Sequence, residues 1–418
     1  MTGGRVSLRF GLAAVVCTLT WAAAWPAEDQ PMLRQQLLEL NNVTGSDPIE
    51  GQIRALVAKP AETKKLLPIA AAMLKEKNPP LNFNALYILG RAAHELKEVK
   101  ASEALYRAAA ERGIKLQSGQ RIAQAFGGLI DLFYDNKKYD ETVQICREFL
   151  DIRGSEVVNR LKPAVLERLI ESVAKQGKLD EALKMVDKLV KAEEEGNGWW
   201  YLQLKGRILR EANRLQEAAK VYEQVSERLP KDKSLKSDQA MRYLQRNRYI
   251  LSGVYVDLNL IDKAAEQLQA LLKEKPDDPT YNNDLGYIWA DHDMKLEEAE
   301  KLIRKAIEQD RKQREELKKQ RELEPDEDQD NPAYLDSLGW VLFKQKKYPE
   351  AKKYLLEAIK TKEGQHIEIF DHLGDVHMAL SEKAEAVAAW KKGVEATGPG
   401  KREKERKAAV EKKIKANQ

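Results

Sequence analysis

Leu, a very small residue and further large residues recur in a fixed order along the C-terminal half of the chain. Each copy starts with Leu followed by Gly or Ser, has a large residue three positions later, and continues with an Ala and another large residue four positions after it. The copies start at Leu251, Leu285, Leu338 and Leu373. Apolar residues three or four positions apart share one face of an α-helix. Each copy therefore predicts two amphipathic helices joined by a turn.

The spacing of the copies is close to constant. Leu285 follows Leu251 by 34 residues, and Leu373 follows Leu338 by 35, which suits one helix-turn-helix hairpin per copy. Small residues in both helices let them approach closely, while the large residues fill the space between neighbouring hairpins. Because only 23 Gly and 15 Pro interrupt 418 residues, we expect an all-α chain.

Two segments carry a family resemblance. Residues 334–340 read Tyr-Leu-Asp-Ser-Leu-Gly-Trp and residues 371–375 read Asp-His-Leu-Gly-Asp, and the unit resembles the tetratricopeptide repeat (TPR), particularly that of large exported bacterial TPR proteins. The resemblance implies a right-handed α-solenoid of stacked helix-turn-helix pairs. It also implies a non-catalytic scaffold or adaptor that holds a partner protein or peptide in a concave groove.

The repeat pattern divides the chain into segments. Leu89, Leu129 and Leu169 lie 40 residues apart, so the upstream helices or turns are longer than those of the clear copies. We expect an N-terminal helical cap or atypical repeat at 31–77, degenerate repeats at 81–230, TPR repeats at 240–310 and 332–396, and a C-terminal capping helix at 401–418.

Residues 311–331 interrupt the pattern and stretch the spacing from Leu285 to Leu338 to 53 residues. The segment is first rich in Lys, Arg and Glu and then acidic. We interpret it as a charged insertion that extends a helix into solvent and ends in an acidic loop. A partner-binding arm is the alternative.

Residues 1–24 are typical of a secretory signal peptide. Arg5 and Arg9 precede an apolar run over residues 10–25, which is short for a membrane span, and small residues at 22–24 suit cleavage. We therefore expect an exported chain, in the periplasm or outside the cell. An uncleaved N-terminal membrane anchor is the alternative, because Trp25 and Pro26 are awkward neighbours for a cleavage site.

Charge and cysteine content narrow the function classes. The formal charge of +4 becomes +2 without Arg5 and Arg9, so no nucleic acid or anionic membrane is demanded. Without the leader only Cys146 remains, and no disulfide can form within the chain. A buried small hydrophobe is a better interpretation of Cys146 than a nucleophile.

Motifs for catalysis are missing or incomplete. The chain has no phosphate-binding Gly-x-x-x-x-Gly-Lys-Ser/Thr loop, and His94-Glu95 lacks the second His that would complete a zinc motif. His372 and His377 lie on different faces of one helix. We expect no enzyme activity, cofactor, metal or small-molecule substrate. An enzyme with an unrecognised site in residues 41–195 is a competing hypothesis.

The family resemblance selects candidate groove residues. In a TPR, the residues two before and two after the motif Leu of the first helix face the groove. The predicted partner-binding positions are Tyr249, Asn283, Tyr287, Asp336, Trp340, Asp371 and Asp375. Aromatic and acidic groups together favour a segment that carries aromatic and basic residues. Alternatively, Tyr287 and Trp340 only pack between repeats, and Asp371 and Asp375 form a surface pair.

Two functions compete with a free adaptor. An accessory subunit of a cell-envelope enzyme, secretion or assembly complex would use the same solenoid to position a catalyst on another chain. The carboxylate clamp of chaperone-tail TPRs is disfavoured, because inward positions that would hold Lys or Arg hold Asn283, Asp336 and Asp371 instead.

Overall fold

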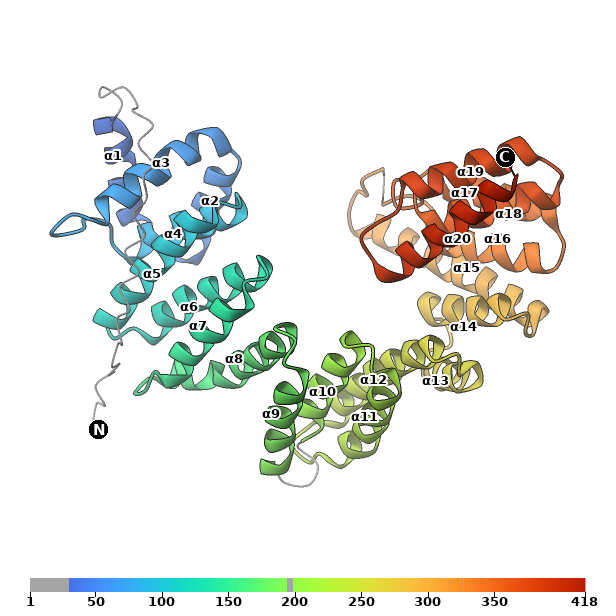
Figure 1. Ribbon diagram of the computed structural model, residues 1–418, viewed down its shortest axis with the longest axis horizontal. Coiled ribbons are helices and arrows are strands. Elements are labelled where there is room, and N and C mark those ends of the chain that lie inside the picture. Colours follow the sequence, from blue (N-terminus) through green and yellow to red (C-terminus); the bar gives the residue numbers. More distant parts are fainter. Residues whose placement is uncertain (1–29, 194–197, 326, 418) are drawn as a thin grey trace. The chain divides into compact units, whose positions relative to one another are not determined.

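The computed structural model describes residues 30–193, 198–325 and 327–417, and within those ranges regular structure is helical throughout (Figure 1). The all-α prediction is confirmed. The predicted signal peptide lies outside the described residues. The described residues form two compact units, unit 1 up to Ala192 and unit 2 from Glu193 onward.

Unit 1 contains the first nine α-helices and a short 3₁₀ helix. They are α1 Gln30–Glu39, η1 Leu40–Asn42, α2 Ser46–Val57, α3 Pro60–Met73, α4 Phe83–Glu95, α5 Val99–Lys115, α6 Gly119–Asp135, α7 Tyr139–Asp151, α8 Glu156–Lys175 and α9 Leu179–Ala192. With 17 residues each in α5 and α6 and 20 in α8, the helices of this unit account for its wider repeat spacing.

Unit 2 contains the remaining helices, again in consecutive hairpins (Figure 1). They are α10 Trp199–Glu211, α11 Leu215–Arg228, η2 Leu229–Lys231, α12 Ser237–Asp257, α13 Ile261–Glu274, α14 Pro279–Asp291, α15 Leu296–Gln320, α16 Pro332–Lys344, α17 Tyr348–Ala358, α18 Ile367–Ala379, α19 Lys383–Glu395 and α20 Lys401–Asn417.

One turn geometry recurs within the hairpins. The second residue after the first helix has a positive φ, as at Lys137, Asn259 and Lys346. The next amide N–H then donates to a carbonyl in the last turn of that helix, for example Lys347 to Leu342 at 2.9 Å. This Schellman-type bond satisfies a carbonyl that the helix end would otherwise leave unpaired. The turns are therefore short and alike.

Small residues set the distance between the two helices of a hairpin. A Cβ added to Gly374 would lie 2.2 Å from the Nε1 of Trp390, and one added to Gly339 would lie 2.6 Å from a side-chain carbon of Leu355. Such distances are far below van der Waals contact, so the large residue of the second helix packs directly on the glycine.

The first part of the charged insertion, residues 311–320, forms the end of α15, which runs for 25 residues. The acidic loop that follows folds back on it, and the Asp330 carboxylate accepts hydrogen bonds from Arg311 and from Arg314, the latter at 2.7 Å. Lys318 pairs with Asp328 at 2.7 Å. Opposite charges of helix and loop thus partly neutralise one another within the chain.

The C-terminal helix α20 packs on α18 and α19. Its Val410 and Ile414 are buried against Ala386 and Trp390 of α19. The narrow apolar stripe of this otherwise charged helix therefore covers the large residue that ends the last hairpin.

Candidate partner-binding surfaces

Five of the seven predicted groove residues lie in one polar network on α14, α16 and α18. The Asp336 carboxylate is 2.9 Å from the Nδ1 atom of His372, and both side chains are buried. The Trp340 ring stacks on the His372 imidazole with centroids 4.1 Å apart and an angle of 13° between the planes. These contacts join two successive first helices, α16 and α18.

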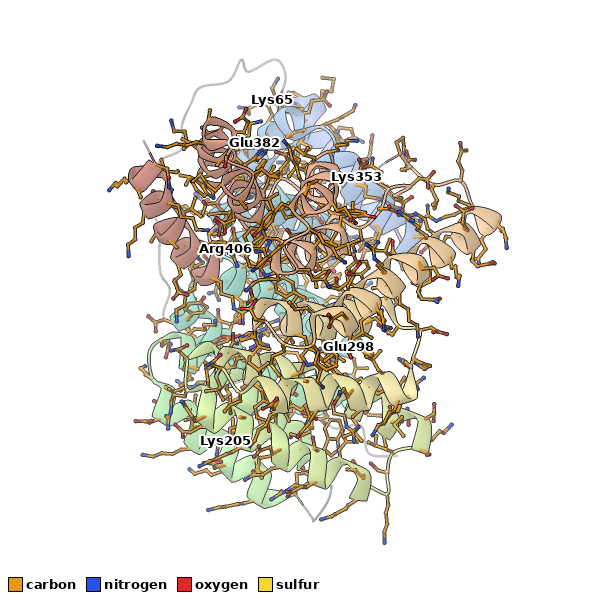
Figure 2. All side chains as sticks on the ribbon, turned by 90° about the vertical axis from the view of Figure 1, so that its right-hand side faces the viewer. Lys65, Lys205, Glu298, Lys353, Glu382 and Arg406 are labelled. Atoms are coloured by element: carbon orange, nitrogen blue, oxygen red, sulfur yellow. The ribbon has the colours of Figure 1, made fainter. Side chains whose placement is uncertain are left out.

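The network continues from α14 through α18 to α20. The Tyr287 hydroxyl donates to Glu368 at 2.7 Å, and Glu368 also accepts from Arg406 of α20 at 2.7 Å. Arg406 is labelled among the side chains drawn in Figure 2. Lys413 of α20 bonds Asp371 and Asp375, each at 2.7 Å. The carboxylates expected to meet a partner's basic side chains thus already meet basic side chains of this chain.

The other two predicted residues lie further along. Tyr249 of α12 is 38% exposed and its hydroxyl donates to Asp284 at 2.8 Å. Asn283 is buried, and its amide N–H donates to Asp284 at 3.3 Å while its carbonyl oxygen has no hydrogen-bond partner within the described residues. Tyr249 of α12 and Asn283 of α14 therefore both donate to Asp284, which links the two successive first helices.

Burial and charge compete throughout this network. Burial opposes protonation of His372, but the Asp336 and Glu368 carboxylates outweigh it and raise the pKa of the imidazole. Burial also disfavours the Glu368 carboxylate, yet Arg406 and His372 hold the pKa of Glu368 below its usual range. For Asp375, burial prevails over Lys413 and raises the pKa. Charge pairing between helices thus favours the charged forms of Glu368 and His372, whereas burial shifts Asp375 toward its neutral form.

A cleft of about 590 Å³ opens beside the network. It lies between the extension of α15, the loop before α16 and the start of α18, and Asp336 and Glu368 form part of its wall. The pairing of these two carboxylates with His372 and Arg406 leaves little unbalanced charge on that wall.

Unit 1 holds a larger cleft of about 860 Å³, lined mainly by α4 and α6. Gly127 and Gly128 of α6 line it together with Arg91 of α4, and the Tyr106 side chain of α5 reaches it. The Tyr106 ring packs against Gly90 and Gly128, because a Cβ on either glycine would lie within 2.9 Å of ring carbons.

The polar groups of this cleft are loosely paired. The Arg91 guanidinium lies 3.4 Å from Glu95 and 3.5 Å from Glu50, and His94 lies 3.4 Å from Asp135. Enclosure by the cleft raises the pKa of Asp131, which Arg168 only partly offsets. Distances of 3.4–3.5 Å lie near the upper limit for a hydrogen bond, so these contacts are weak and a ligand can replace them.

Family models match along both units. A model described as "Tetratricopeptide repeat" matches residues 68–117, 168–233 and 254–314, and a second model with that description matches residues 333–363. The chain belongs to the tetratricopeptide-repeat family. TPR arrays generally serve as protein–protein interaction scaffolds.

Named relatives share the repeat. A TPR repeat-containing protein from Pseudomonas aeruginosa is 28% identical over 217 residues, which cover 52% of this chain and 31% of that protein. The chain thus spans less than a third of that relative's length.

Solved TPR structures are also similar. One from Parabacteroides merdae has 15% identity and a TM-score of 0.45, and covers 71% of this chain and 99% of its own. A thermophilic TPR protein from Thermus thermophilus has 17% identity and a TM-score of 0.37, and covers 51% of this chain and 98% of its own.

The unit 1 cleft was not among the predicted sites, although the same TPR spacing selects it. Counting two residues before and after Leu89 and Leu129 gives Tyr87, Arg91, Gly127 and Asp131, all of which line the cleft. The predicted groove residues come only from the clear C-terminal copies, where the pattern is strongest.

Two further observations describe the surface as a whole. None of the described helices is long and apolar enough to cross a membrane. Among the same residues, no three or more His, Cys, Asp or Glu side chains are grouped so that they could hold a metal ion.

Proposed function

We propose that this chain is an exported, non-catalytic scaffold that binds a partner protein along the first helices of its hairpins. The observation that carries the proposal is the open cleft of unit 1, in which residues at inward TPR positions of α4 and α6 present charged groups to solvent. Repeated first helices offer an extended surface of this kind, which suits an extended or helical segment of another protein.

The composition of the inward positions supports a protein partner. Tyr87, Arg91 and Asp131 combine an aromatic surface with one charge of each sign. Aromatic and Arg side chains supply much of the binding energy in protein interfaces, and carboxylates add specificity for basic groups. Such a mixed surface has no strong preference for a polyanion.

Export is proposed from the sequence of residues 1–24. It places the partner in the cell envelope or outside the cell. The partner is either another soluble protein or a subunit of a membrane-associated machine, and the two cases differ in the fraction where the complex is found.

The test is crosslinking in intact cells of the native host, followed by affinity purification of the full tagged chain from separate soluble and membrane fractions. We expect the chain outside the cytoplasm, crosslinked to a defined protein. An unrelated exported helical protein with the same tag is the control. Recovery of the chain from the cytoplasm alone would contradict export, and recovery without any specific protein would contradict the scaffold role.

A further inference from the structure

Packing within the hairpin does not explain why a glycine stands at position 127. Gly127 lies inside α6, where Gly is less favourable for helix formation than Ala. A Cβ built on it would meet no atom within 4 Å. Packing therefore does not require the absence of a side chain here, in contrast to Gly128, whose added Cβ would lie 2.4 Å from the Tyr106 ring.

Because Gly127 has no side chain, the cleft stays open at this position. Gly127 and Ala123 lie one helical turn apart on α6, and both line the cleft. A strip without long side chains allows another polypeptide backbone to approach the helix closely, which is a recurrent use of glycine. The wall is thus suited to a flat, extended ligand.

A buried hydroxyl at the cleft lacks a partner. Tyr106 is fully buried, lines the cleft, and its hydroxyl makes no hydrogen bond to the described residues. A buried hydroxyl without a hydrogen bond is unfavourable, because it has lost its bonds to water without gaining another partner. The nearby Arg91 guanidinium, held only by contacts of 3.4 Å or more, is a second donor. Both groups suit backbone carbonyls.

Helix α6 supplies negative charge to the cleft. No hydrogen bond or ion pair joins the Asp131 carboxylate to another described side chain, and the nearby charges of Arg168, His94 and Arg91 offset only part of the rise in its pKa. Asp135, one turn further, has only the contact of 3.4 Å with His94. A carboxylate that is partly enclosed and weakly paired gains most from a cationic partner. Lys and Arg side chains provide this cation.

We propose that the cleft between α4 and α6 binds an extended peptide segment of the partner, with its backbone against Gly127 and a Lys or Arg side chain at Asp131. The Tyr106 hydroxyl and Arg91 take carbonyl oxygens of that segment. This inference rests on the proposed scaffold function and names the part of the partner that unit 1 recognises.

The test is selection of a phage-displayed library of random linear peptides on the immobilised full chain, with affinities of enriched peptides measured by fluorescence anisotropy. We expect enriched peptides with Lys or Arg at one fixed position. Replacing that residue by Ala in the peptide should weaken binding about tenfold or more, as should Asp131→Asn in the protein.

Gly127→Trp places a large side chain in the cleft, from a position where an added Cβ meets no atom within 4 Å, and Gly253→Trp is its matched control. A Cβ on Gly253 of α12 also meets no atom within 4 Å, so both variants should fold, which circular dichroism checks. We expect Gly127→Trp to abolish binding of the enriched peptides and Gly253→Trp to leave it unchanged.

Each other outcome counts against the inference. Undiminished binding to Gly127→Trp, or enrichment without a basic position, overturns the assignment of the cleft, and so does the absence of any enriched peptide. Loss of binding only in Gly253→Trp moves peptide recognition to unit 2 and leaves the scaffold function standing. Capture of a partner protein in cells by the Gly127→Trp variant would also contradict the assignment of the cleft and leave the scaffold function standing.

Discussion

A glycine in the first helix of a hairpin controls how closely the second helix packs. In unit 2 the residues that meet these glycines include Ile303, Leu355 and Trp390, and all three are nearly or fully buried. The small-and-large pattern in the sequence was sufficient to predict these pairs, because packing leaves no other size combination at that distance.

Gly374→Ala should destabilise unit 2. The new methyl group would lie 2.2 Å from Trp390 Nε1, and overpacking of this kind costs about 1–3 kcal/mol. Gly253→Ala is the control, since its methyl group enters open space and improves helix propensity by up to about 1 kcal/mol. Urea unfolding of the full chain measures both. Equal effects of the two variants would contradict direct packing on Gly374.

Turn residues show what the sequence did not reveal. Most of the described left-handed turn positions hold residues other than Gly, among them Lys137, Asn259 and Lys346, and a Lys gives no local signal for a positive φ. The turn is imposed by the packing of the two helices and by the Schellman-type bond, which depend on the folded hairpin.

Polar contacts fix successive first helices of unit 2 to one another. Asp336 of α16 and His372 of α18 form a buried pair, with Glu368 and Arg406 close by and Tyr287 of α14 facing the same ring. The TPR spacing selected Asp336 but not Glu368, and it could not reveal that the cations come from α18 and α20, because pairing across helices depends on the curvature of the stack.

The His372 pair makes the stability of unit 2 depend on pH. Because the folded pKa is raised above the ordinary value, the folded state binds the proton more tightly than the unfolded chain does. This stabilisation is full below the unfolded pKa, near 6.5, and is lost as the pH rises through the folded pKa. We expect the unfolding free energy of wild type, relative to His372→Gln, to fall over that window in urea titrations. A constant difference would contradict a protonated pair.

Helix α20 should contribute strongly to the stability of unit 2. Deleting residues 401–418 removes the buried Val410 and Ile414 from Trp390, a loss of roughly 3 kcal/mol or more at about 1.5–3 kcal/mol per side chain. It also removes the cations from Asp371. The deletion is compared with Arg406→Gln/Lys413→Gln, which keeps the apolar contacts. If the double variant destabilised unit 2 as much as the deletion, charge pairing rather than burial would hold α20.

Across the whole chain, the repeat pattern predicted the fold but not the position of the larger open cleft. The clear copies of unit 2 matched the pattern best, yet all seven of their predicted inward residues bond within the chain. The degenerate copies of unit 1 contain the larger cleft. Two positions before the motif Leu, Gly127 leaves space where Asn283 and Asp336 carry side chains. Two positions after it, Arg91 and Asp131 stand where unit 2 has the aromatic residues Tyr287 and Trp340.

The central claim is that first helices, and not second helices, contact the partner. A photoreactive amino acid at Gln124 of α6 or Tyr249 of α12 tests it in intact cells, with exposed Glu111 of α5 and Glu266 of α13 as second-helix controls. The account predicts crosslinks to a partner protein from Gln124, from Tyr249 or from both, and none from the controls. Crosslinks confined to Glu111 and Glu266 would contradict it.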